Sequence, residues 1–159
     1  MKLTLQAAAL ALIAFALMLR TPQVSGLSME PHIDSGEYVV INTLAYRFES
    51  PQRTEIVAFR HERTAPEVFI KRIIGVPGDT IRIDHGAVYR NGAPLDEPYV
   101  RFRDNRSEAT LTVPADGYYV LGDNRANSED SRTWGFVKSG DIIGRAMFGL
   151  WPLDRVGSL

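Results

Sequence analysis

Lys71 lies in an apolar segment, residues 67–74, that reads as a β-strand. The two-residue period of a strand places Lys71 on one face with Phe69 and Ile73, and Arg72 on the other. An ammonium group among apolar neighbours is poorly solvated, so burial disfavours its charged form and lowers its pKa. Lys71 thus has the chemistry of a general base. The structural alternative is a lysine that extends to solvent at the rim of the sheet.

Two other segments carry nucleophilic or hydrogen-bonding side chains. Ser28-Met29-Glu30-Pro31 places a hydroxyl eight residues after Arg20, although such a pattern is most often an ordinary turn. Residues 122–132, GDNRANSEDSR, contain a single apolar side chain. A segment of this kind is either a surface loop or a polar network packed beside a site.

The order of these segments resembles that of the bacterial type I signal peptidases, membrane-anchored serine proteases with a Ser/Lys dyad. An apolar amino-terminal segment is followed by Ser-Met-x-Pro, Lys-Arg-x-x-Gly-x-Pro-Gly-Asp and Gly-Asp-Asn-Arg-x-x-Ser-x-Asp-Ser-Arg, with every fixed position filled. The resemblance runs from the amino terminus to about Leu150. It implies an endopeptidase that removes signal peptides from secretory precursors, cuts after a small-x-small sequence, and needs no cofactor or metal.

By the same resemblance, Ser28 is the nucleophile and Lys71 is its general base. A serine hydroxyl is a weak nucleophile until a base takes its proton, and a neutral lysine can be that base. The resemblance assigns Ser128 to orienting the base. Some members have a hydroxyl donor two positions before the nucleophile, where this chain has Gly26. The backbone N–H groups of Ser28 and Gly26 are therefore the expected oxyanion donors.

The resemblance also implies a structural ion-pair group formed by Arg72, Asp130 and Arg132. A buried guanidinium needs a carboxylate, and we expect Arg72 to pair with Asp130. The remaining motif positions, Asp123, Asn124 and Arg125, are expected to be scaffolding.

The substrate is expected to bind in an extended form, by strand addition, beside residues 21–28 and 68–71. The predicted cleft residues are Val24, Ser25, Met29, Phe69 and Ile70.

Residues 3–19 contain no charge and are bracketed by Lys2 and Arg20. As a helix they span about 26 Å, close to the thickness of a bilayer core. We interpret residues 1–21 as a retained membrane anchor that contacts lipid, because no A-x-A-like cleavage site follows Arg20. The charges mildly favour a cytoplasmic amino terminus, which leaves residues 22–159 as an extracytoplasmic catalytic domain on a single-pass protein of the cytoplasmic membrane.

Beyond the anchor, short runs of β-branched and aromatic residues alternate with turn residues, which is typical of an all-β domain. The resemblance implies coiled antiparallel β-sheets of the signal-peptidase and LexA-like protease fold. A small β-hairpin insertion is predicted over 80–121, with a mobile polar loop at 97–109, and 43–48 as the one stretch with helical character. The turns expected between strands are Asp84-His85-Gly86 and Asn91-Gly92. The predicted strands are Tyr38–Ile41, Glu55–Arg60, Glu67–Ile74, Thr80–Ile83, Ala87–Arg90, Thr110–Val113, Tyr118–Leu121 and Asp141–Trp151.

The composition of the chain excludes or disfavours several classes of function. A formal net charge of -1 disfavours nucleic-acid partners, and the absence of Cys excludes disulfides and thiolate chemistry. His32, His61 and His85 lack metal-binding spacing, so we interpret them as surface or turn residues. Two other functions stay open: an anchored β-domain that binds exported peptides without cutting them, and a Ser/Lys peptidase that processes pilus-type substrates. A self-cleaving repressor is disfavoured because no DNA-binding domain or basic surface is present.

Overall fold

A computed structural model describes residues 19–61, 67–152 and 156–158 of the chain. Residues 1–18 of the predicted membrane anchor lie outside these ranges. Leu19–Arg20, which fall within the predicted anchor, form strand β1 and pair with Asn42 and Ile41. No helix within the described ranges is long and apolar enough to cross a membrane.

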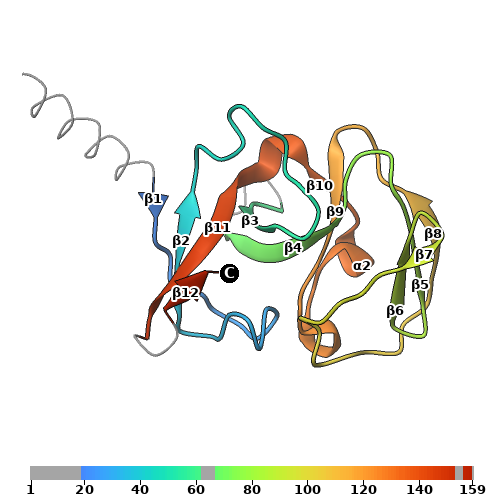
Figure 1. The fold of residues 1–159 in the computed structure, drawn as a ribbon, viewed down its shortest axis with the longest axis horizontal. Helices are drawn as coiled ribbons and strands as arrows, with labels where there is room; N and C mark the ends of the chain where they lie inside the picture. Colours follow the sequence, from blue (N-terminus) through green and yellow to red (C-terminus); the bar gives the residue numbers. More distant parts are fainter. Residues whose placement is uncertain (1–18, 62–66, 153–155, 159) are drawn as a thin grey trace, which may run out of the picture.

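Most strands join one antiparallel sheet, which lies on the left of Figure 1. Their order is β1-β2-β11-β3-β4-β9-β10, and β12 pairs with β11. The bounds after β1 are β2 Tyr38–Asn42, β3 Ile56–Phe59, β4 Phe69–Gly75, β9 Gly117–Leu121, β10 Val137–Lys138, β11 Ile142–Trp151 and β12 Gly157–Ser158.

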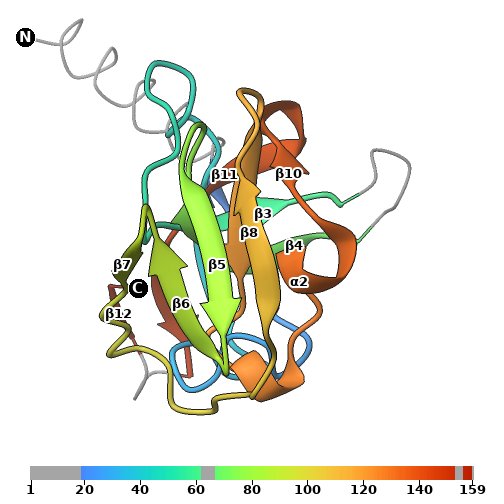
Figure 2. The same ribbon diagram turned by 90° about the vertical axis from the view of Figure 1, so that its right-hand side faces the viewer.

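A second antiparallel sheet has four strands in the order β7-β6-β5-β8 and faces the viewer in Figure 2. Its bounds are β5 Thr80–Asp84, β6 Ala87–Arg90, β7 Ala93–Pro94 and β8 Glu108–Thr112. The short helical turns are η1 Arg125–Asn127, α2 Ser131–Trp134 and η2 Ser139–Asp141.

All eight predicted strands are present, and the all-β class is confirmed. Both predicted hairpin turns are present too: His85-Gly86 and Asn91-Gly92 have positive φ angles, as tight two-residue hairpins require. Residues 43–48 form turns rather than a helix. The insertion is shorter than predicted, because Gly117–Leu121 is β9 of the large sheet, paired with β4.

Apolar side chains pack against both faces of β4, and one of these faces meets the small sheet. Ile74, on one face, packs with Ile81 and Val88 of the small sheet and with Leu121 of β9. Ile73, on the other face, packs in a separate buried cluster that includes Val57 and Val120. β4, which carries Lys71, is therefore fixed from both sides.

The segment between β7 and β8, residues 95–107, is called the strap here. It covers most of the polar loop predicted as mobile, and its central residues Arg101, Phe102 and Arg103 are exposed. Glu97, however, is only 4% exposed, and the carbonyl of Phe102 accepts a hydrogen bond from Ala126 at 3.2 Å. The strap is thus fastened to the segment that follows β9, which corrects the prediction of a freely solvated loop.

Candidate active site

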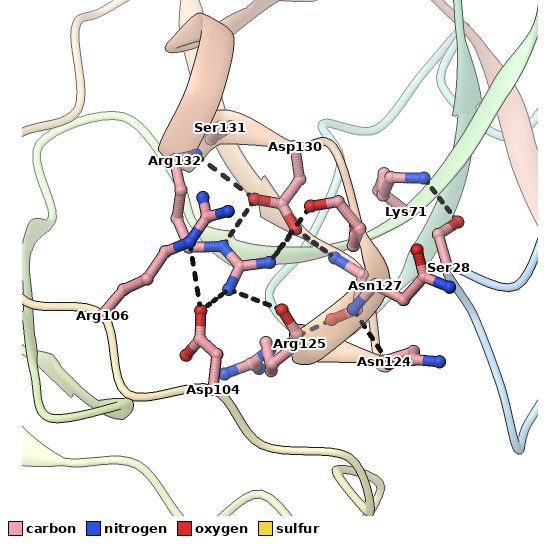
Figure 3. Close-up of polar contacts among 12 residues, drawn as sticks. Ser28, Lys71, Asp104, Arg106, Asn124, Arg125, Asn127, Asp130, Ser131 and Arg132 are labelled. Carbon is pink, nitrogen blue, oxygen red and sulfur yellow. Dashed lines mark hydrogen bonds and ion pairs between the residues drawn. The ribbon is translucent and has the colours of Figure 1, made fainter.

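The fold brings Ser28 and Lys71 together although 43 residues separate them in the chain. The Lys71 Nζ atom donates to Ser28 Oγ at 2.7 Å (Figure 3). It also donates to the carbonyl of Ile70 at 3.1 Å. Lys71 comes from the middle of β4 and Ser28 from the turn that precedes β2. This is the spacing of a hydroxyl and an amine between which a proton can pass directly.

The turn that carries Ser28 is fixed by its neighbours. The amides of His32 and Ile33 both donate to the carbonyl of Met29 at 3.0 Å, which closes the chain into a compact turn. Met29 and Ile33 are buried in the core cluster of β2 and β3. The carbonyl of Ser28 accepts from the amide of Asn124 at 3.0 Å, so the turn is also tied to the segment after β9.

Lys71 is 4% exposed, and its predicted position on the face of Phe69 and Ile73 is confirmed. Its Nζ lies 5.9 Å from the centroid of the Phe69 ring. Burial lowers the pKa of Lys71 from 10.5 to about 8, against the opposing effect of the charges of Asp130 and Asp123. A base with this pKa has an appreciable neutral fraction near neutral pH.

Gly122 is a site residue for which sequence analysis gave no role. It directly follows β9, beside β4. A Cβ atom at this position would overlap the hydroxyl of Ser128 and would lie 2.5 Å from the carbonyl oxygen of Ser28. Only glycine permits this close approach. The signal in the sequence was the placement of this glycine directly after a buried strand.

Ser128 lies against Gly122, beside the predicted dyad. Its hydroxyl oxygen is buried and has no hydrogen-bond partner of ordinary geometry among the described residues. The structure therefore brings Ser128 to the site without a hydrogen bond to Lys71, and its predicted role in orienting the base stays a prediction.

The expected ion pair of Arg72 with Asp130 is wrong. Arg72 donates to both carboxylate oxygens of Asp123, at 2.8 and 2.6 Å. The strand register explains the choice: Arg72 pairs with Leu121, and Asp123 follows two residues later on the same face. His32 lies near the same carboxylate, with 3.5 Å between its Nδ1 atom and Asp123 Oδ2.

Asp130 instead pairs with Arg132, whose Nε and Nη2 atoms donate to its two oxygens at 2.8 and 2.7 Å. Burial opposes the charge of Asp130, but the hydrogen bonds from Arg132 and from the Gly122 amide hold the pKa of Asp130 below its ordinary value. Asp130 also caps α2 by accepting from the amide of Arg132. The predicted supporting role of Asp130 and Arg132 thus has a geometric basis.

A groove of about 300 Å³ leads to Ser28 and Lys71. One wall is a segment held to the loop before β2: the amide of Val24 donates to the carbonyl of Glu37 at 2.7 Å. The opposite wall is the start of β4. All five predicted cleft residues line the groove: Val24, Ser25, Met29, Phe69 and Ile70, together with Pro22, Gln23, Glu67 and Val68.

Gly26, a predicted oxyanion donor, has a φ of +104°, a conformation that disfavours any side chain. Its amide donates to the hydroxyl of Ser35 at 3.3 Å. This N–H group already has a partner, and Gly26 would have to exchange it to bind an oxyanion.

None of the three histidines makes a hydrogen bond or ion pair with Ser28 or Lys71 among the described contacts. His85 occupies the β5–β6 turn and is exposed, and His61 packs on the ring of Trp134 at 4.4 Å between centroids. Across the described parts of the chain, no cluster of three or more His, Asp or Glu side chains is arranged to hold a metal ion.

Comparison with known proteins gives consistent matches. The family model described as "Signal peptidase, peptidase S26" matches residues 1–151. The chain is 44% identical over 137 residues to the "Probable signal peptidase I-2" of Synechocystis sp., covering 83% of this chain and 63% of that protein. It is 39% identical to the "Signal peptidase I" of Leptolyngbya laminosa, covering 83% and 68% of the two chains. The chain therefore spans somewhat less than two thirds of the first of these relatives.

A solved structure shares the fold. The crystal structure of a signal peptidase I from Enterococcus faecalis V583 is similar with a TM-score of 0.53 and 37% sequence identity. The similarity covers 61% of this chain and 97% of that one.

Proposed function

The chain belongs to the signal peptidase family, peptidase S26, and from this premise we propose that it is a serine endopeptidase that removes signal peptides from secretory precursor proteins. The observation that carries the proposal is the 2.7 Å contact between Lys71 Nζ and Ser28 Oγ, two residues that line a groove of about 300 Å³. Family membership supplies the reaction class, and the groove accounts for a polypeptide substrate.

In this proposal neutral Lys71 takes the proton of Ser28 as Ser28 Oγ attacks the carbonyl carbon of the scissile bond. A neutral amine keeps two N–H donors and one lone pair. It can therefore still donate to the carbonyl of Ile70 while it accepts from Ser28. The protonated Lys71 then gives its proton to the leaving amine, and an acyl-enzyme on Ser28 remains.

Deacylation uses the same pair. Lys71, neutral again after the amine leaves, takes a proton from a water that attacks the ester carbonyl of the acyl-enzyme. Collapse of the second tetrahedral intermediate breaks the bond to Ser28 Oγ, which recovers its proton from Lys71. The oxyanion in both steps is assigned to the backbone N–H of Ser28, with Gly26 contributing only if its amide leaves Ser35.

We assign Ser128 to the orientation of the base. Its buried hydroxyl lies against Gly122 and interacts with Asp130, but it makes no hydrogen bond of ordinary geometry among the described residues. A buried unpaired hydroxyl carries a desolvation cost. Rotation of the Lys71 side chain toward Ser128 in the catalytic cycle would relieve this cost and hold the amine in place.

The substrate lies between the two backbone walls of the groove in this proposal, by strand addition. Alternate side chains of an extended chain point to the same side, so the first and third residues before the cut face one wall. The apolar side chains of Met29 and Ile70 line the groove, and we infer that they leave room only for small residues at these two positions.

We also propose that the apolar amino-terminal segment tethers the enzyme in the cytoplasmic membrane, with the β-domain on the extracytoplasmic side. The support is the uncharged run of residues 3–19 in the sequence. A membrane-tethered substrate and a tethered enzyme meet at raised effective concentration. Removal of the segment would then weaken action on membrane-bound precursors more than on short soluble peptides.

Cleavage of a purified secretory precursor in detergent tests the function. Wild type, Ser28→Ala and Lys71→Ala are compared, and the new amino terminus is sequenced. Cleavage by the wild type alone, after a small-x-small sequence, is the expected result. Three folded but inert proteins would instead favour a β-domain that binds exported peptides without cutting them.

A further inference from the structure

The strap places two carboxylates, one buried and one partly buried, against the segment that follows β9. Glu97 pairs with Arg125, with distances of 2.5 and 3.1 Å between their atoms, and both side chains are at most 2% exposed. Asp104 accepts from Arg132 Nη1 at 2.5 Å, where the Arg132 side chain is 1% exposed and that of Asp104 13% (Figure 3). Desolvated, charge-assisted pairs of this kind fix the positions of both partners.

The Glu97–Arg125 pair is connected by a hydrogen bond to the carbonyl of Gly122. Arg125, whose guanidinium is held by Glu97, donates from Nε to the Gly122 carbonyl at 3.0 Å. Without the charge of Glu97, the guanidinium would lose the two contacts that aim this donor.

The Asp104–Arg132 pair is connected, through Asp130, to the amide of Gly122. Arg132 donates a hydrogen bond to Asp104 and also donates to both carboxylate oxygens of Asp130. Asp130 Oδ2 in turn accepts from the Gly122 amide at 3.0 Å. Both backbone polar groups of Gly122 are therefore fixed by the strap, each through one arginine.

Gly122 touches both serines of the site. A Cβ atom at this position would meet the hydroxyl of Ser128 and the carbonyl of Ser28, so the glycine backbone packs directly on both. A displacement of Gly122 displaces Ser28 relative to Lys71. A shift of about 1 Å in a reacting group costs up to roughly a hundredfold in rate.

We propose that Glu97 and Asp104 are positioning residues for peptide-bond cleavage, acting through Arg125 and Arg132 on Gly122 and thereby on Ser28. The inference rests on the proposed function. It gives the small sheet and its strap a part in the reaction, because they supply the carboxylates that complete the charge network of the catalytic segment.

Electrostatics supplies a readout that a purely structural role would not produce. The charge of Arg132 lowers the pKa of Lys71, and that of Asp130 raises it. Asp104 partly neutralises Arg132. In Asp104→Asn the positive charge of Arg132 is less compensated, so the pKa of Lys71 falls. The acid limb of the pH profile of kcat should move to lower pH.

The experiment measures kcat, KM and the pH profile for wild type, Asp104→Asn and Glu97→Gln with a precursor-derived peptide. Asp84→Asn is the matched control, since Asp84 also pairs with an arginine of the small sheet, Arg82, but both side chains are largely exposed. We expect kcat to fall about ten- to a hundredfold in the first two variants, with KM near the wild-type value. Asp84→Asn should match the wild type.

Circular dichroism fixes a temperature at which each variant is folded, and kinetics are measured there. Glu97→Gln leaves Arg125 buried and unpaired, so it is the variant at risk of unfolding. If Glu97→Gln does not fold, the test rests on Asp104→Asn alone. This substitution keeps the shape of the side chain and lies at the less buried pair. A folded Asp104→Asn with wild-type kcat and an unshifted profile overturns the inference. An inert wild type would overturn the proposed function instead.

Discussion

Arg72 donates hydrogen bonds to both carboxylate oxygens of Asp123, and it lies on the face of β4 opposite to the one that carries Lys71. Its guanidinium also donates to the carbonyl of Thr54 at 2.8 Å and lies 4.2 Å from the centre of the Tyr99 ring. Adjacent residues of one strand thus have opposite electrostatic environments. This difference supports the proposal that Arg72, which has a full carboxylate partner, is structural and that Lys71, which has none, is the base.

Arg72→Met should destabilise the protein strongly because it leaves the charge of Asp123 buried without its partner. Breaking a buried ion pair costs about 3–5 kcal/mol in the free energy of unfolding. Urea denaturation measures the loss. Arg82→Met is the control, since it breaks the exposed pair with Asp84 and should change stability little. Equal effects of the two substitutions would contradict the structural role of Arg72.

Activity should rise with pH and level off above about 8, because Lys71 must be neutral to act as a base and its pKa is about 8. The pH dependence of kcat/KM reports this group in the free enzyme. Lys71→Arg keeps a cation that does not lose its proton, and it should be inactive at every pH. A robustly active Lys71→Arg enzyme would refute the dyad.

Burial of Lys71 should also affect the free energy of unfolding and its dependence on pH. The folded-state pKa of about 8 lies below the ordinary 10.5, so the buried charge destabilises the fold below pH 8. This penalty is relieved as pH rises from about 8 to 10.5. Lys71→Met removes it, and should raise the free energy of unfolding at pH 7 by at most about 3 kcal/mol. Urea unfolding at pH 7 and pH 10 should show the gain shrinking; a gain independent of pH would exclude this cause.

Gly122→Ala should abolish most activity, since its Cβ would collide with the carbonyl of Ser28 and the hydroxyl of Ser128. Overpacking of this kind costs about 1–3 kcal/mol in stability. Gly157→Ala is the matched control: Gly157 also has no positive φ, and its Cβ would meet no atom within 4 Å. Peptide cleavage rates and thermal melts measure both effects. Near-wild-type activity of Gly122→Ala would show that the close approach is dispensable.

Ser128→Ala should separate function from stability. Its hydroxyl has no partner of ordinary geometry within the described structure, so removing it should leave the melting temperature unchanged or slightly higher. Cleavage should slow, but less than in Ser28→Ala, because in the proposed mechanism Ser128 orients the base and does not attack the substrate. Equal losses in the two variants would place Ser128 in a primary chemical role.

The sequence predicts which residues form strands because hydrophobic alternation and turn residues are local signals. The pairing of β5 with β6 follows from the Asp84-His85-Gly86 turn in the same way. The partner of Arg72 could not be predicted, since it depends on the register of β4 against β9, two strands that are far apart in the chain. The roles of Gly122, Glu97 and Asp104 were missed for the same reason. Each proposed role depends on a contact between segments with no local pattern in common, whereas Ser28 and Lys71 lie in motifs that can be recognised one at a time.

The position of β11 has a consequence for biogenesis. This strand, Ile142–Trp151, lies between β2 and β3, although it is the last long strand to be synthesised. Until it inserts, the facing edges of β2 and β3 are unpaired. The segment of β2, which follows the Ser28 turn, and the β3–β4 pair, which carries Lys71, are therefore joined in one sheet by a strand that is synthesised after both of them.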